Sequence, residues 1–454
     1  MRVSSSVRSG LGRFALRLVR AIELGLVAAA GLLSRFRAGR GSLRTLWGTT
    51  PILTLPLLAR CDRLLGLRSQ SLVFVTYYIT SAFDINLQWV DNLTLSPKIR
   101  GKYPWAYGAA RRLVFFWALL RYDVFHYYYD RGVMESPYRI GINPEELALL
   151  RRAGKRLYTY AYGADVRTRE TVLALGGHNI CKACPEPMKF CICSEEAGRI
   201  NMENIKKFAT QMIATGDMRM HVPGFRELFY WPIDVDDERF TFVGVAPNDD
   251  RPLRIAHAPN HAPFKGTQYI LDAVERLQRE GRSIELVKVQ GVPNHKVLEL
   301  FRSCDLVVDQ LIQGSYGYTA LEAMALGKPV IACLREPAMV IDPETCPIIS
   351  AWPESIYDRL KEVLDGKYDL QILGRESRAY VAHYQSLQAV ALRLGELYLD
   401  TAGFPDKTNR KLRVRLASIA SGLPPPPTGR VPVPWAALAS LEAYPPAVAA
   451  PANG

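Results

Sequence analysis

Residues 314–332 read GSYGYTALEAMALGKPVIA, and the pattern in this stretch decides the fold class. A loop with two glycines leads into a short apolar helix, which stops at Gly-Lys-Pro before a run typical of a buried strand. Another strand-like run, DLVVDQL at 305–311, comes before the loop. A strand, a loop, a helix and a second strand in this order predict a parallel α/β unit.

The same alternation extends over most of the chain. In the first half the predicted strands are SLRTLWG (42–48), SLVFVTYY (71–78), YDVFHYYY (122–129) and RLYTYAYG (156–163). In the second half they lie at 253–259, 284–291, 305–311, 329–334 and 346–351, with helical patterns such as 267–281 between them. We therefore predict an α/β fold of two Rossmann-like, doubly wound domains that face a cleft.

The predicted boundaries follow shifts in composition. A flexible basic arm covers 1–42, and the first domain covers 43–240 with a Cys-rich insert at 178–196. The second domain covers 241–402 and ends in a helix that crosses back to the first domain; the linker between the domains lies within 236–252. A Pro- and Ala-rich tail covers 403–454, and we expect it to be disordered because it cannot form a packed core.

The charge of the chain is unevenly distributed. The formal net charge is +13, of which residues 1–44 contribute +8 and residues 402–454 contribute +4. The body between them is therefore nearly neutral. Because it lacks the basic footprint of a nucleic-acid-binding protein, we expect no nucleic-acid partner.

The amino-terminal arm has the pattern of a basic amphipathic helix. Its longest uncharged run, Leu24 to Ser34, is too short to span a bilayer, which takes about 20 helical residues. Arg13, Arg17 and Arg20 lie mainly away from an apolar stripe. The stripe consists of Leu11, Phe14, Leu18, Ile22, Gly25, Ala29, Leu33 and Phe36. This pattern predicts contact with an anionic membrane surface.

Other interpretations of the arm stay open. It has the composition of a transit peptide, or the reading frame begins further along the chain. If lipid contact comes from the folded body, the aromatic segment from Trp105 to Trp117 is the alternative. We see no secretory signal with a cleavage site, so we expect a cytoplasmic protein that is peripheral on the inner face of the membrane. Deleting 1–40 should then release the protein from anionic vesicles without affecting its activity.

Glu322 is the only carboxylate in an apolar helix, and two interpretations compete. Thr319 and Glu322 have the spacing of a capping box, in which the glutamate reaches back to the start of the helix. Alternatively, the carboxylate accepts hydrogen bonds from the paired hydroxyls of a ribose, at roughly 1.5–3 kcal/mol each. Gly314 and Gly317 would let the backbone approach such a ligand, and the helix start would offer free N–H groups to a phosphate.

Lys265 and Gly266 open a second helix, after the strand-like run that ends at 259. A cation at a helix start costs roughly 0.3–1 kcal/mol unless an anion lies there too. A diphosphate between Lys265 and the helix would remove this cost, and removing Lys265 would then not destabilise the ligand-free protein. The alternative is a solvated surface lysine.

The run from Arg254 to Leu334 resembles the donor half of GT-B glycosyltransferases, closest to the retaining family-four kind. Over 43–402 as a whole the likeness is strong only in the second half. It implies that Lys265 binds the diphosphate of a nucleotide-sugar, that Gly317 approaches the phosphates and the sugar, and that Glu322 holds the ribose. The predicted donor-binding residues are Gly48, Asn260, His261, Lys265, Gly266, Gly291, Gly314, Ser315, Tyr316, Gly317 and Glu322.

Three positions depart from the family pattern. Gly314 stands where the family often has a second glutamate, and Asn260 and His261 lie near the position of an absent arginine. Tyr162 replaces a histidine in the run YGADVR. In that run Asp165 and Arg167 follow a strand, so they are predicted to orient an acceptor hydroxyl, or else they pair with each other. With Lys265 they are the predicted catalytic residues.

The resemblance implies a retaining enzyme that transfers a sugar from a nucleotide-sugar to an acceptor hydroxyl. The expected acceptor is a glycan or a lipid-linked molecule, in the assembly of a surface polysaccharide or glycolipid. The alternatives are a nucleotide-sugar epimerase and a non-catalytic GT-B module that binds a nucleotide or a partner enzyme. No Asp-x-Asp-like pair lies at a suitable loop, so we expect no cofactor for catalysis.

The eight cysteines fall into two groups. Four of them, Cys181, Cys184, Cys191 and Cys193, have a spacing that predicts a structural zinc site, although a Cys-rich loop without metal is the alternative. The others lie in apolar runs and are predicted core residues, namely Cys61, Cys304, Cys333 and Cys346. His126, inside an aromatic strand, is also a predicted core residue.

Overall fold

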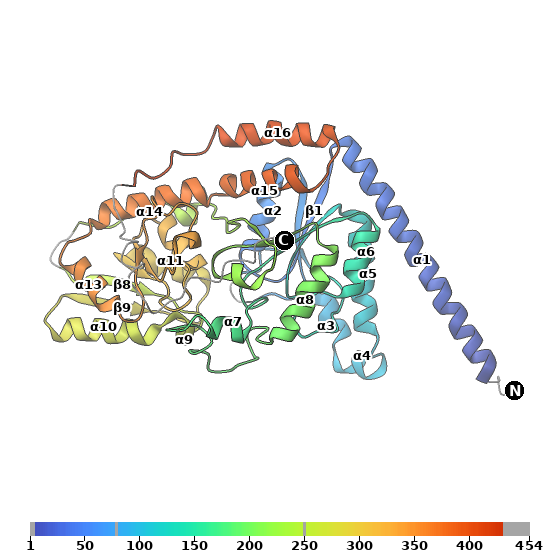
Figure 1. Ribbon diagram of the computed structural model, residues 1–454, viewed down its shortest axis with the longest axis horizontal. Coiled ribbons are helices and arrows are strands. Elements are labelled where there is room, and N and C mark those ends of the chain that lie inside the picture. Colours follow the sequence, from blue (N-terminus) through green and yellow to red (C-terminus); the bar gives the residue numbers. More distant parts are fainter. Residues whose placement is uncertain (1–4, 78–79, 248–250, 430–454) are drawn as a thin grey trace.

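The computed structural model describes residues 5–77, 80–247 and 251–429, with side chains from residue 17 onward. Two parallel sheets form the body of the molecule (Figure 1), which confirms the predicted α/β fold. The first sheet has the order β3 (Ile85–Asn86), β2 (Arg68–Val73), β1 (Arg44–Thr49), β4 (Val124–Tyr128), β5 (Arg156–Tyr160), β6 (Gln211–Ala214) and β7 (Arg226–Glu227). The second has the order β12 (Ile349–Ser350), β11 (Val330–Ala332), β10 (Leu306–Val308), β8 (Leu253–His257) and β9 (Ile284–Lys288).

Helices connect and cover the strands. Those of the first unit are α1 (Ser5–Arg40), α2 (Thr54–Leu64), α3 (Gln88–Thr94), α4 (Pro97–Lys102), α5 (Ala106–Arg121), α6 (Pro144–Arg152), α7 (Arg169–Leu173) and α8 (Glu195–Phe208). Those of the second are α9 (Ala262–Lys265), α10 (Thr267–Arg279), α11 (Asn294–Ser303), α12 (Tyr318–Ala325) and α13 (Ile356–Leu364). The last three are α14 (Leu370–Tyr384), α15 (Leu387–Thr401) and α16 (Asp406–Ala420). Short 3-10 helices lie at Gly216–His221, Glu238–Phe240 and Pro337–Met339.

Local sequence explains why these elements form. The strands β10 and β11 are continuous apolar runs, and β1, β4 and β5 are rich in aromatic and β-branched residues. Nearly all residues of these strands are buried, as expected for a parallel sheet covered on both faces. In α10 the residues Ile270, Ala273, Val274 and Leu277 recur at helical spacing and are buried. The strands β3, β6 and β7 escaped prediction because each has four residues or fewer and no long β-branched run.

The end of the chain returns to the first unit, as predicted for the crossover helix. In Figure 1, α14 and α15 lie below α16 and run from the second unit to the first, and α15 packs on α2. The hydroxyl of Tyr398 in α15 donates to Asp62 Oδ1 at 2.7 Å and lies 2.9 Å from His126 Nε2. All three side chains are fully buried, so His126 is a core residue, as predicted.

The amino-terminal arm is helical, but part of it belongs to the folded body. Val27, Ala30 and Ser34 of α1 are buried, and Arg37 forms an ion pair with the buried Asp123 at 2.6 Å. These residues lie off the predicted apolar stripe, and the stripe residues from Leu18 to Phe36 are exposed. The prediction of a flexible arm is therefore wrong for this part of α1, and deleting residues 1–40 would also leave Asp123 without Arg37.

The predicted disordered tail contains a further helix. Helix α16 contacts α1 and α15, its residue Leu412 is buried, and the Thr408 hydroxyl donates to the carbonyl of Ala38 at 2.6 Å. The prediction of disorder from 403 onward was therefore wrong for Asp406–Ala420. Most of the Pro- and Ala-rich stretch, residues 430–454, lies outside the described residues.

None of the helices in the described part of the chain combines the length and the apolar character that a bilayer crossing requires.

The Tyr398 hydroxyl should stabilise the closed arrangement of the chain. We expect Tyr398→Phe to lower the free energy of unfolding by about 1–3 kcal/mol, because the buried Asp62 loses a donor. Urea unfolding measures this. Tyr357→Phe is the matched control, since the Tyr357 hydroxyl bonds the exposed Glu280, and equal losses in the two variants would contradict the assigned role.

Candidate functional site

Three neighbouring strands of the second sheet bring the predicted donor residues together. The strands β10, β8 and β9 lie next to one another, and their carboxyl ends lead into α12, α9 and α11 in turn. Lys265 comes from α9, Asn294 from α11 and Glu322 from α12. The predicted residues Lys265 and Glu322 thus meet at the edge of the sheet where ligands of open α/β sheets bind.

Lys265 forms an ion pair rather than lying in solvent. Its Nζ is 2.6 Å from Asp309 Oδ1, and Asp309 is fully buried. The other carboxylate oxygen, Oδ2, accepts a hydrogen bond from the backbone N–H of Gly317 at 2.7 Å. Asp309 therefore positions the two groups that the resemblance assigns to the phosphates. Sequence reasoning missed it, although a carboxylate at the end of a buried strand, in DLVVDQL, was a usable signal.

Gly317 is required by this close approach. A Cβ atom at residue 317 would lie 3.0 Å from Asp309 Oδ2 and 3.1 Å from Lys265 Nζ. The same space is what a phosphate oxygen would need in order to reach the lysine. The small residue keeps it open.

Glu322 is 5% exposed and does not cap its helix. The N-cap residue is Gly317, and no side chain caps the helix, so the predicted capping box is absent. Among the described residues, its side-chain donor is Asn294, whose Nδ2 lies 2.7 Å from Oε1. Burial raises the pKa of Glu322 to about 7, although the bond from Asn294 lowers it. A buried carboxylate with so few donors is poorly compensated in the ligand-free protein.

The remaining predicted residues of the second domain fall into different settings. Asn260 and His261 are exposed, and the His261 ring lies 5.0 Å from that of Phe190 in the Cys-rich insert. Tyr316 points away from the site, because its hydroxyl is buried and accepts from Gln385 Nε2 at 2.9 Å. Gly266 lies at the start of α10, and Gly291 lies in the loop before α11.

Asp217 joins the two units. Its Oδ2 accepts from Arg167 at 2.7 and 2.9 Å, and its Oδ1 accepts from the Ser315 hydroxyl at 3.1 Å. Burial raises the pKa of Asp217, but Arg167 outweighs this and lowers it. Arg167 and Ser315, both predicted site residues, thus meet through a carboxylate that sequence reasoning missed.

Asp165 is surrounded by backbone N–H groups that it holds in place. It is fully buried and accepts backbone N–H bonds from Tyr129, Tyr162 and Gly163 at 2.8–3.1 Å. Burial and the nearby Asp130 raise its pKa to about 7. Because its oxygens hold the loop after β5, it does not pair with Arg167, and the alternative that the two side chains pair with each other is wrong.

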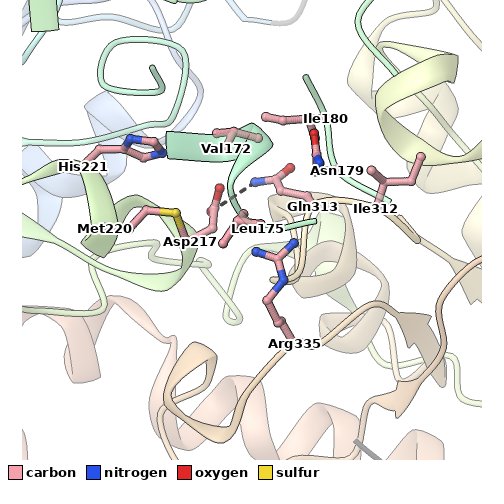
Figure 2. A pocket seen from close by; sticks show the side chains of 10 residues that line it. All are labelled: Val172, Leu175, Asn179, Ile180, Asp217, Met220, His221, Ile312, Gln313 and Arg335. Carbon is pink, nitrogen blue, oxygen red and sulfur yellow. Dashed lines mark hydrogen bonds between the residues drawn. The ribbon is translucent and has the colours of Figure 1, made fainter. Parts of the chain in front are cut away.

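A small cavity lies between the units beside Asp217 (Figure 2). Val172, Asn179 and Ile180 line it from one side, and Gln313 and Arg335 line it from the other. The Gln313 amide donates to Asp217 Oδ1 at 3.3 Å across it. About 10 Å³ is open to the centre of a water molecule, which is room for roughly one water. Gly314, with φ of +90°, follows Gln313 and packs against Arg335.

Polar groups also gather at the carboxyl ends of β1, β4 and β5 in the first sheet. The Thr50 hydroxyl donates to Asp130 Oδ1 at 2.5 Å, and the Arg131 guanidinium donates to Oδ2 at 2.8 Å. The Tyr162 hydroxyl lies 3.5 Å from Oδ2. Gly48, a predicted site residue, is buried in β1 near this group. Asp130 follows the aromatic run that contains β4. Its position after a strand was the only sequence signal that it could belong to a site.

The zinc site at the four cysteines of the insert remains a prediction. All four thiols are free and partly exposed; burial and the charge of Cys193 raise the pKa of Cys181 to about 11. Within the described ranges no group of three or more His, Cys, Asp or Glu side chains is placed to hold a metal ion. The other four cysteines are buried, as predicted for core residues.

No protein-family model and no curated protein matches the chain. Among solved structures it is similar to HepE from Anabaena in complex with UDP, at 13% identity, with 79% of this chain and 99% of that chain covered and a TM-score of 0.47. It is also similar to sucrose-phosphate synthase from Thermosynechococcus elongatus, at 12% identity, 79% and 98% coverage and a TM-score of 0.49.

A third similar structure is a protein assigned as a UDP-N-acetylglucosamine 2-epimerase from Listeria monocytogenes, at 12% identity, 79% and 96% coverage and a TM-score of 0.39. Because the identities are this low and the TM-scores lie below 0.5, the function proposed below rests on this chain's own residues.

The ion pair of Lys265 changes the predicted effect of removing this lysine. The sequence predicted no loss of stability, whereas the ion pair with Asp309 predicts a loss. We expect Lys265→Ala to lower the free energy of unfolding of the ligand-free protein by about 3 kcal/mol, because Asp309 would be left buried and unpaired. The double variant Lys265→Ala/Asp309→Asn should recover part of this loss. Chemical denaturation of both variants measures the difference. Unchanged stability of Lys265→Ala would show that the lysine is merely solvated.

Proposed function

We propose that this protein transfers a glycosyl group from a nucleotide-sugar to an acceptor hydroxyl. The observation that carries the proposal is Glu322, a buried carboxylate with Asn294 as its donor, on the helix that follows Gly317 and near Lys265. Paired ribose hydroxyls would supply the missing donors, and a diphosphate would meet the cation and the backbone N–H groups at the helix start. A nucleoside diphosphate matches all three features.

Lys265 has the donors that such a reaction requires. An ammonium group donates up to three hydrogen bonds, and the bond to Asp309 uses one of them. The pair therefore holds Lys265 in place while leaving it able to contact a phosphate. As the bond to the sugar breaks, the leaving diphosphate gains negative charge, and positioned donors stabilise that charge.

The first unit would supply the acceptor side. Asp130 lies at the carboxyl ends of the first sheet with Thr50, Arg131 and Tyr162 around it. This group offers acceptors and donors for a hydroxyl-rich molecule. Asp165 is less suited, because backbone N–H groups occupy its oxygens.

The two units meet beside the loop that contains the predicted donor residue Ser315. Asp217 of the first unit accepts from the Ser315 hydroxyl across this interface. We infer that this contact rearranges when a donor enters.

The arm would place the enzyme at an anionic membrane, on the inner face, where lipid-linked or growing glycan acceptors are found. Leu18 and Ile22 of α1 are more than half exposed, as is Phe36. Among the described residues no acid pairs with Arg35, Arg151 or Arg152, which line the groove beside the exposed Leu32. Each such cation near an anionic surface contributes about 1 kcal/mol.

The donor site is tested first by a panel of UDP-, GDP- and ADP-sugars in thermal-shift measurements. We expect one nucleotide class to stabilise the wild type, and Glu322→Gln to weaken its binding by roughly tenfold to a hundredfold through loss of charge-assisted bonds. The control is Glu299→Gln, because Glu299 is exposed and pairs with Lys296. Equal binding by Glu322→Gln and wild type would refute the ribose assignment.

Product analysis separates the activities. Transfer or hydrolysis releases a nucleoside diphosphate, whereas an epimerase forms a second nucleotide-sugar. Binding without any product would identify a non-catalytic module.

Membrane attachment is tested by Leu18→Ser/Ile22→Ser in co-sedimentation with anionic vesicles. We expect weaker binding at unchanged thermal stability, since both side chains are exposed, and weaker binding of the wild type at high salt. Val414→Ser on the exposed face of α16 is the control. If the double variant binds as well as the control does, α1 makes no lipid contact.

A further inference from the structure

We propose that residues 93–105 are a second docking surface for an anionic lipid bilayer. They extend from the end of α3 through α4 to the residue before α5. This tip surface deepens the membrane attachment proposed above, but it rests on observations of its own. It lies outside α1 and away from the donor residues.

The tip surface exposes large apolar and aromatic side chains. Trp105 is 67% exposed and Leu93 is 56% exposed. Leu95 and Tyr103 are also exposed, and in residues 93–105 only Thr94 is buried. Helix α4 has no buried residue at all among its six. Four large apolar or aromatic side chains exposed within thirteen residues indicate a binding surface.

The charged residues of the tip surface itself are all cations, whereas Arg111 and Arg112 further along the chain pair with acids. Residues 92–122 contain six lysines and arginines and no aspartate or glutamate. Lys98, Arg100 and Lys102 are exposed within the tip surface, and Lys102 Nζ lies 5.3 Å from the centre of the Tyr103 ring. The nearest preceding acid, Asp91, is largely buried and lies 3.9 Å from the Arg111 guanidinium. An anionic partner is therefore favoured over a neutral or cationic one.

The combination of residues favours lipid over protein. Tryptophan and tyrosine with neighbouring lysines are typical of the interface between membrane and water, where an apolar ring enters the headgroup layer and a cation meets phosphate. The tip surface contains both kinds of residue within thirteen positions.

The place of the tip surface in the molecule suits this role. In Figure 1, α4 forms an extremity of the first unit, and the amino-terminal end of α1 reaches the same lower side of the molecule. Helices α3, α4 and α5 contact one another, so the tip is a supported projection. Two separate contacts on one side would fix the orientation of the enzyme at the bilayer.

Two tip variants of the full chain test the proposal, Tyr103→Ala/Trp105→Ala and Lys98→Glu/Lys102→Glu. Binding to vesicles of phosphatidylcholine with phosphatidylglycerol is measured by flotation, and light scattering reports the oligomeric state. We expect each variant to bind roughly tenfold or more weakly than wild type, with an unchanged melting temperature because the altered side chains are exposed. Lys206→Glu/Lys207→Glu, on exposed residues of α8, is the control with the same change of charge.

The outcomes separate this proposal from the others. Selective loss of vesicle binding in both tip variants supports the tip surface, whatever the result for Leu18→Ser/Ile22→Ser or for nucleotide binding. Binding equal to that of the control overturns it. A variant that dissociates an oligomer without weakening vesicle binding also overturns it, because the tip would then be a contact between copies of the chain.

Discussion

The Tyr398 hydroxyl donates to the buried carboxylate of Asp62, and this bond connects the last part of the chain to the first. Asp62 also accepts from Thr45, Trp47 and Ser69, so one carboxylate joins β1, β2 and α15. Burial raises its pKa, while these donors lower it. Because an unsatisfied buried carboxylate is costly, the four donors must be present together. The last helices are thereby fixed to the first sheet, and α15 follows α14, which packs on α12 of the second unit.

Buried carboxylates recur through the molecule, and their donors distinguish structural from functional ones. Asp165 is supplied by backbone N–H groups, and Asp217 is paired with Arg167. Asp309 is paired with Lys265, which keeps free donors. Glu322 differs from all of these, because the donor described for it is a neutral amide. A carboxylate that binds the hydroxyl groups of a ligand is expected to have few donors from the protein itself.

Cations and exposed apolar residues share two places, the solvent face of α1 and the tip surface. The donor site, in contrast, is formed by a few charged residues that are buried or already paired. The proposed membrane contacts and the proposed donor site therefore lie in different parts of the molecule, and a surface variant should affect one without the other. Asp217, which accepts from the Ser315 hydroxyl, connects the first unit to the loop before α12.

The sequence by itself determined the α/β class, most of the strands and the positions of Lys265, Gly317 and Glu322, because apolar periodicity and glycine placement are local properties. Only the tertiary structure decided which partners these residues have. Asp309 and Asn294 lie 44 and 28 positions from their partners, and no local pattern records such a pairing. For the same reason the sequence could not show that α1 packs on the body through Val27 and Ala30. A residue's type limits what it can bind, but burial and distant neighbours decide what it does bind.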